Sequence, residues 1–150
     1  MYHAIVRRRA KGVFASVSQA DFQSVARQVT DDVHHVFAGD HALGGERHTK
    51  QALVSWFARL HRLFPDLRFE VGEVVAKGWP WRTVVALEWV AQGTLPNGEP
   101  YRNTGAHVVR MRWGRAAYIH AYEDSQTVAA ACRRIAASGI EEAAAPPITT

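Results

Sequence analysis

The chain has 150 residues, 47% of them hydrophobic and 21% charged, so its length predicts a single domain and its apolar content excludes a disordered chain. The 18 basic and 14 acidic residues leave a net charge of +4. Apart from Arg7, Arg8 and Arg9 the basic residues are spread out, which argues against the concentrated basic stripe of a nucleic-acid binder.

From the sequence we expect neither a membrane segment nor a secretion signal. No run of about 18 apolar residues exists, so we expect no membrane span. The N-terminus carries arginines where a signal peptide has an apolar stretch, so we expect a cytoplasmic protein. Cys132 is the only cysteine, which excludes an internal disulfide and a multi-cysteine metal site.

Helical spacing of apolar residues dominates the N-terminal half of the chain. It predicts helices over residues 4–17 and 50–64, and a short helix that begins after Asp21 as its N-cap. Between them, residues 33–38 (VHHVFA) predict a strand. We expect His35 to point inward, because its same-face neighbours are Val33 and Phe37.

After Pro65 the apolar pattern changes to period two, which predicts four long strands joined by tight turns. The strands are expected at 67–77, 82–94, 101–113 and 116–124, followed by a last helix at 125–137. Residues 1–138 would form the single domain. The tail, 139–150, would be flexible or dock on a partner subunit.

Helices gathered at the start and strands at the end predict an α+β domain, with a strongly bent antiparallel sheet wrapped around the N-terminal helices and enclosing a pocket. A two-residue loop at Gly114–Arg115 would set His107 opposite Tyr122, and Gly105 opposite Asp124. A three-residue loop would shift this register. On strand 82–94 the apolar face carries Trp89, which leaves Glu88 outside.

Several segments together resemble the nuclear transport factor 2-like superfamily, in its polyketide cyclase (SnoaL-like) and ketosteroid isomerase-like branch. The likeness covers about residues 4–138 and rests on TDDVHHVFAGD (30–40), RLFPDLRFEV (62–71), EWVAQGT (88–94) and VVRMRWGRAAYIHAYEDSQ (108–126). It implies a cone-shaped domain whose pocket often holds an acid–base carboxylate on the last strand. Asp124 matches that position, and His107 matches an assisting polar residue on the preceding strand.

These residues predict a cofactor-free enzyme that acts on a small hydrophobic carbonyl compound by isomerisation, cyclisation or dehydration. Asp124 would be a general base whose pKa is raised by desolvation, with His107 as its partner and Tyr122 and Asn103 as hydrogen-bond donors. Asp124 could instead be the N-cap of the last helix, as could Ser125. The other substrate-binding candidates are His35, His120, Trp56, Phe57, Trp89 and Phe14.

Two other functions fit the same pattern: a non-catalytic module that binds a small ligand, and a dimerisation module. The resemblance implies a homodimer, with the outward sheet face as a plausible interface. We expect no metal, because the histidines are not spaced as HExxH. Trp79 and Trp81 at a hairpin tip predict a contact surface.

Overall fold

The computed structural model describes residues 1–150. Its elements follow the predicted order: α1 (Tyr2–Ser18), α2 (Phe22–Arg27), β1 (Val29–Phe37), β2 (Gly45–Arg47), α3 (Lys50–Leu63), β3 (Arg68–Trp79), β4 (Arg82–Thr94), β5 (Pro100–Arg112), β6 (Arg115–Glu123), α4 (Ser125–Ala137) and the 3₁₀ helix η1 (Glu141–Ala144). The short strand β2 was not predicted, and β1 begins four residues earlier than expected.

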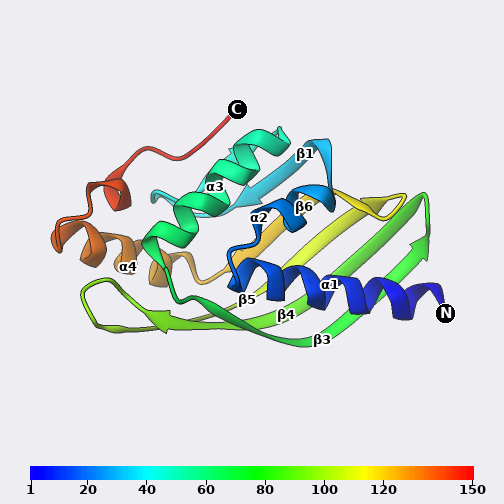
Figure 1. Ribbon diagram of the computed structural model, residues 1–150, viewed down its shortest axis with the longest axis horizontal. Helices are drawn as coiled ribbons and strands as arrows, with labels where there is room; N and C mark the ends of the chain where they lie inside the picture. Colours follow the sequence, from blue (N-terminus) through cyan, green and yellow to red (C-terminus); the bar gives the residue numbers. More distant parts are fainter.

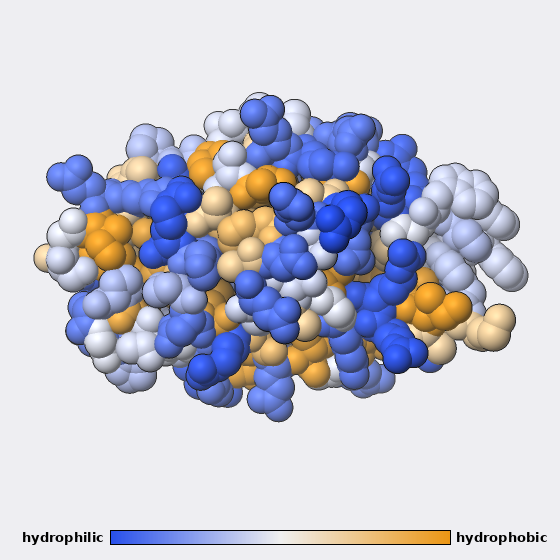
Figure 2. Space-filling model, in the orientation of Figure 1, coloured by the Kyte–Doolittle hydropathy of each residue, from blue (hydrophilic) through white to orange (hydrophobic).

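The six strands form one open sheet in the order β2-β1-β6-β5-β4-β3. Helices α1, α2 and α3 lie on one face of it, and α4 with η1 lies beyond one end (Figure 1). The α+β prediction is confirmed, but the sheet is mixed because β1 pairs with β6 in parallel. No helix is long and apolar enough to cross a bilayer. Figure 2 shows the helix-bearing face as mostly hydrophilic, with apolar residues visible near its middle.

Side-chain caps and apolar stripes explain where the covering helices begin and how they dock. Asp21 accepts a hydrogen bond from the Ser24 amide at 3.1 Å and starts α2, as predicted. Thr49 does the same for α3 through the Ala52 amide at 3.1 Å. The buried stripe of α3, which includes Trp56, faces the sheet. This packing closes the concave side of the sheet.

The predicted register of β5 and β6 is wrong for two reasons: the loop begins one residue earlier than the predicted Gly114–Arg115, and a β-bulge follows it. The two loop residues are Trp113 and Gly114, with φ of 52° and 78°, a pair of left-handed conformations that suits a tight hairpin. Met111 then pairs with Ala116, but the next pairing in the register joins Arg110 to Tyr118. One residue of β6 is therefore left unpaired. Beyond this bulge, each β6 side chain points to the face of the sheet opposite to the predicted one.

As a result, the inward face of β6 carries Ile119, Ala121 and Glu123 instead of the predicted polar set. His107 faces Ala121, whereas Tyr122 pairs with Ala106. The prediction for strand β4 is confirmed: Trp89 is 5% exposed and Glu88 is exposed on the outside.

Gly105 on β5 allows the large Trp89 side chain to lie across the neighbouring strand. A Cβ at this position would lie 2.5 Å from Cζ2 of Trp89 and 2.5 Å from the Tyr122 carbonyl oxygen. No side chain fits there without displacing the indole or the backbone of β6. The absence of a side chain at Gly105 therefore sets the position of Trp89.

The C-terminal tail packs on its own chain. Glu142 in η1 forms ion pairs with Arg59 and Arg62 of α3. Further along, the Ile148 carbonyl accepts a hydrogen bond from Arg47 Nε at 2.9 Å. The tail thus lies over α3 and β2, where the sequence suggested either a flexible segment or contact with a partner subunit.

Replacing Gly105 with alanine should lower the free energy of unfolding by about 1–3 kcal/mol, because the added Cβ overlaps the Trp89 ring. The measurement is urea unfolding followed by tryptophan fluorescence. Gly12→Ala is the matched control: Gly12 lies in α1 with nothing within 4 Å of its Cβ position, so this change should stabilise by about 1 kcal/mol. Equal effects of the two substitutions would contradict the close-approach explanation.

Candidate functional site

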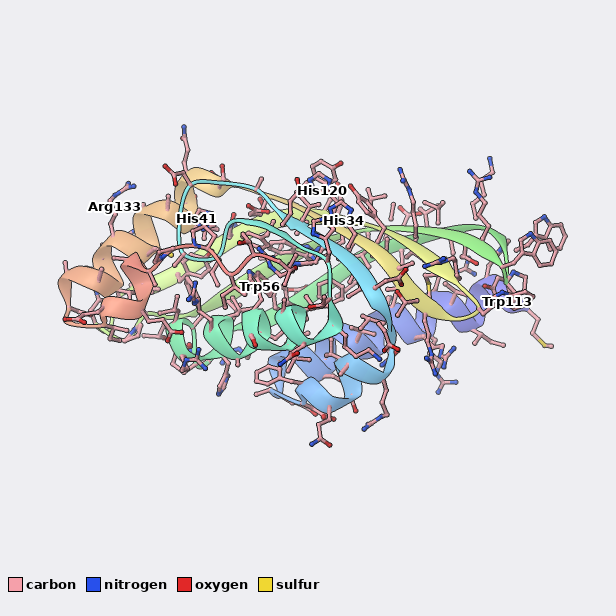
Figure 3. All side chains as sticks on the ribbon, turned by 90° about the horizontal axis from the view of Figure 1, so that it is seen from above. His34, His41, Trp56, Trp113, His120 and Arg133 are labelled. Atoms are coloured by element: carbon pink, nitrogen blue, oxygen red, sulfur yellow. The ribbon has the colours of Figure 1, made fainter.

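A cavity of about 140 Å³ lies between the concave side of the sheet and the covering helices. Of its 29 lining residues 24 are hydrophobic, and the others are Arg9, Gln28, His35, Asn103 and His107. The predicted substrate-binding residues Phe14, Trp56, Phe57 and Trp89 all line it. Trp56 is seen between α3 and the sheet in Figure 3. An apolar cavity with few polar groups is typical of a small-molecule site.

His107 on β5 is one of two imidazoles in this cavity. Trp89 Nε1 donates a hydrogen bond to its Nδ1 at 2.7 Å, and Phe14 packs edge-on against the ring at 5.1 Å. Burial lowers the pKa of His107 to about 4, so the ring is neutral at physiological pH. Because Nδ1 accepts, the proton is on Nε2, which has no partner in the protein. The residue therefore offers the cavity one N–H donor.

His35 on β1 is held in the same way, by a different donor. It is 2% exposed, and Arg47 Nη1 donates to its Nδ1 at 2.5 Å. Burial, together with the positive charge of Arg47, keeps the pKa of His35 well below its usual value. The neutral ring again carries its proton on Nε2, and the edge of Trp56 packs against it at 4.6 Å between ring centres. The inward direction predicted for His35 is confirmed.

Arg47 is fully buried, and sequence reasoning missed it. Its guanidinium donates to the carbonyls of Gly44 at 2.8 Å and Ile148 at 2.9 Å, besides His35. Burial lowers the pKa of Arg47 to about 10, so it stays charged at neutral pH. Its position opposite His35 on strand β2 was the available signal, but β2 is too short to be predicted from periodicity.

Asn103 lines the cavity, but its amide group is engaged in the protein. Its Nδ2 donates to Tyr101 Oη at 3.3 Å and to the Asp124 carbonyl at 3.2 Å, and its Oδ1 accepts from the Thr104 amide at 2.8 Å. These bonds join the end of β5 to the start of α4. Asn103 therefore shapes the cavity wall more than it offers a free donor.

Asp124 does not line the cavity, and the prediction of a raised pKa is wrong. Its carboxylate caps α4 by accepting hydrogen bonds from the amides of Gln126 at 3.1 Å and Thr127 at 3.2 Å, and from Thr127 Oγ1 at 2.9 Å. The bonds from Thr127 lower its pKa. Of the two alternatives left open by the sequence, Asp124 is the cap and Ser125 is the first helical residue.

Tyr122 and His120 also lie outside the cavity, because the bulge turns them to the outer face. Their rings stack at 3.8 Å between centres, and Tyr122 is 52% exposed. His120 is labelled on the outer side of the sheet in Figure 3, beside His34. The predicted hydrogen-bond donor Tyr122 therefore cannot reach a ligand in the cavity.

Glu123 lies on the inward face of β6, where the predicted register had placed other residues. Both of its carboxylate oxygens are buried without a hydrogen-bond partner, and burial raises its pKa to about 7. It is not among the residues that line the cavity. No carboxylate lines the cavity, and its polar residues are Arg9, Gln28, Asn103 and the two imidazoles.

The hairpin tips at one end of the molecule carry three exposed tryptophans. Trp79 stacks on Trp81 at 6.0 Å between ring centres, and Trp81 contacts Trp113 at 6.2 Å. Figure 3 shows Trp113 at this end. The contact surface expected at this tip and the expected homodimer both stay predictions.

The neutral state of His107 makes stability depend on pH. The unfolded chain takes up a proton on this residue near pH 6.5, whereas the folded protein does so only near pH 4. The free energy of unfolding should therefore fall as the pH is lowered from 6.5 to 4, by on the order of 3 kcal/mol from this group. Urea titrations of the wild type and His107→Phe should diverge over this window. Parallel curves would contradict a buried neutral His107.

Replacing Asp124 with alanine should lower the melting temperature by about 2–4 °C, because the first turn of α4 loses its cap. Asp124→Asn is the control, since asparagine caps about as well. Calorimetric scans at pH 7 separate the two. A stabilised alanine variant would instead mark Asp124 as a strained functional carboxylate.

Solved structures of similar fold share little sequence with this chain. A nuclear transport factor 2-like protein of unknown function from Burkholderia pseudomallei has a TM-score of 0.70 at 17% identity, over 81% of this chain and 92% of that one. A proposed SnoaL-like polyketide cyclase from Jannaschia sp. CCS1 gives 0.72 at 14%, over 86% and 92%. A proposed polyketide cyclase from Xanthomonas campestris gives 0.62 at 21%, over 81% and 94%.

No curated protein matches the chain. Residues 10–119 match the family model of the SnoaL-like domain. This segment runs from α1 into β6 and contains both imidazoles of the cavity. The chain has the fold of the nuclear transport factor 2-like structures, and the match over most of its length shows that it belongs to the SnoaL-like domain family.

Proposed function

We propose that the protein binds a small, mostly apolar carbonyl compound and activates it for proton transfer at the neighbouring carbon, as an isomerase, cyclase or dehydratase would. The observation that carries this proposal is the pair of neutral imidazoles, His35 and His107, in a cavity where 24 of the 29 lining residues are hydrophobic. The names of the polyketide cyclase-like neighbours agree with it.

The size of the cavity limits the ligand. An engineered protein cavity of about 150 Å³ holds benzene, so about 140 Å³ suits a molecule with one six-membered ring. His35 lies on β1 and His107 on β5, and these two strands pair with opposite edges of β6. Ala121 of β6 pairs with His107. A ligand that carries oxygen atoms at two separate positions would use both donors.

The chemistry follows from the protonation state of the rings. A neutral imidazole whose Nδ1 is occupied donates through Nε2–H and is a weak base. When hydroxide or another base from solvent takes a proton from the carbon next to a carbonyl, the electron pair of the C–H bond moves to the carbonyl oxygen and negative charge develops there. A hydrogen-bond donor fixed in an apolar site stabilises this charge, by about 3–4 kcal/mol in measured cases. His107 would supply this donor.

Binding without turnover is the second candidate, and a specific observation favours it. No carboxylate lines the cavity, so the lining offers no residue suited to accept the proton from carbon. The former base candidate, Asp124, is committed to capping α4. The two functions share the donor groups and differ only in whether hydrogen leaves the bound ligand.

Acetophenone and α-methylstyrene form a matched pair of probes, because they differ in whether the group beside the ring is C=O or C=CH₂. We expect acetophenone to bind at least about tenfold more tightly, since only it accepts a hydrogen bond. His107→Phe should weaken this preference, because only the His35 donor remains, while keeping the affinity for α-methylstyrene. Competition with a fluorescent hydrophobic dye measures both affinities. Equal affinity of the two probes for the wild type would refute the proposal.

Deuterium exchange separates catalysis from binding. In D₂O the methyl hydrogens of bound acetophenone should exchange faster with wild-type protein than with His107→Phe, and NMR follows the loss of the methyl signal. Asp124→Asn should exchange at the wild-type rate. Tight binding with exchange no faster than in buffer would select the binding function.

A further inference from the structure

The outer face of the β1–β2 hairpin gathers three side chains able to bind a metal ion. His34, Glu46 and His48 each offer one ligand atom, and these atoms all lie within 4.8 Å of one another. His35 pairs with Arg47 and Val36 with Glu46, so His34 and His48 are opposite each other on the next pair of the antiparallel ladder. None of the three lines the cavity.

The strand pairing alone already fixes part of this arrangement. Alternation places His34, Glu46 and His48 on the face opposite to His35 and Arg47. The His34 and His48 rings are nearly parallel, with centres 4.4 Å apart, and His34 Nε2 lies 2.7 Å from Glu46 Oε2. The edge of Tyr118 packs against His34 at 5.2 Å.

The C-terminal tail orients the second imidazole. The His48 amide donates to Thr150 Oγ1 at 2.6 Å, and His48 Nδ1 lies 3.3 Å from the Thr150 main-chain oxygen. When Nδ1 carries the proton and donates to that oxygen, Nε2 keeps its lone pair for a metal. A hydrogen bond from the second ring nitrogen to a carbonyl is the usual support of a metal-binding histidine.

We propose that His34, Glu46 and His48 form a binding site for a divalent ion of the zinc type. Two imidazoles and one carboxylate suit Zn²⁺ and its late first-row neighbours, whereas Mg²⁺ and Ca²⁺ prefer oxygen ligands alone. Three protein ligands leave a coordination position for water. The side chains of His34 and Glu46 are 34% and 55% exposed, so an ion reaches them from solvent.

The test uses tag-free protein stripped with a chelator and titrated with Co²⁺, whose visible absorption reports its ligands. We expect saturation at one ion per chain and displacement of Co²⁺ by Zn²⁺, but not by Mg²⁺. His34→Ala and His48→Ala should each weaken binding at least about tenfold. His61→Ala is the matched control, because His61 is an exposed histidine on α3 outside the cluster.

Three results would overturn the site: no saturable absorption, a loss with His61→Ala as large as with His34→Ala, or Co²⁺ binding unchanged in both cluster variants. Circular dichroism of each variant shows that the fold is retained. The outcome is independent of the proposed function, because acetophenone binding depends on the other face of the hairpin. His34→Ala should leave that binding unchanged.

Discussion

An imidazole enclosed by apolar side chains must be neutral and must find a partner for one nitrogen, and this constraint organises the interior of the protein. For His107 the partner is Trp89, whose indole reaches Nδ1 across a strand that has no side chain at Gly105. For His35 the partner is Arg47. In both cases a side chain of the protein donates a hydrogen bond to Nδ1, so the N–H group at Nε2 is the donor available to a ligand in the cavity.

The hydrogen bond between Arg47 and His35 links the cavity to a distant part of the chain. A buried arginine needs acceptors for its remaining N–H groups, because an unpaired buried charge is strongly destabilising. Arg47 finds them in the carbonyls of Gly44 and Ile148. The position of His35 therefore depends on the C-terminal tail, a segment that carries no lining residue of its own.

The sequence supports the elements better than the site, for physical reasons that differ from residue to residue. Apolar periodicity places α3 and the inward face of β4 correctly, including Trp89, because burial imposes the pattern directly. A single skipped residue in β6 leaves no trace in that pattern, yet it turns Tyr122 outward and Glu123 inward. For Asp124 the sequence allows two roles, because an aspartate between a strand and a helix is equally suited to capping and to catalysis. The hydrogen bonds that its carboxylate accepts from backbone amides identify it as the cap.

The spacing of residues in the sequence could not predict the buried Arg47 or the cluster of His34, Glu46 and His48. The partners on β1 and those on or next to β2 are at least 12 positions apart in the sequence, and they meet only through the antiparallel register of a three-residue strand. The same register sends adjacent histidines, His34 and His35, to opposite faces of the sheet. One hairpin therefore supports two chemically separate sites without shared ligands.

The parallel pairing of β1 with β6 has a consequence for how the molecule assembles. The strand that carries His35 is made early and β6 is made late, yet His35 and Ile119 are neighbours in the sheet. Joining them requires closure of a loop that includes α3 and four strands, and such long-range pairing is slow. The cavity cannot be complete in any fragment that lacks β6. A ribosome-bound chain would expose its apolar walls until β6 had emerged, and apolar surface exposed in this way makes a chain prone to aggregation.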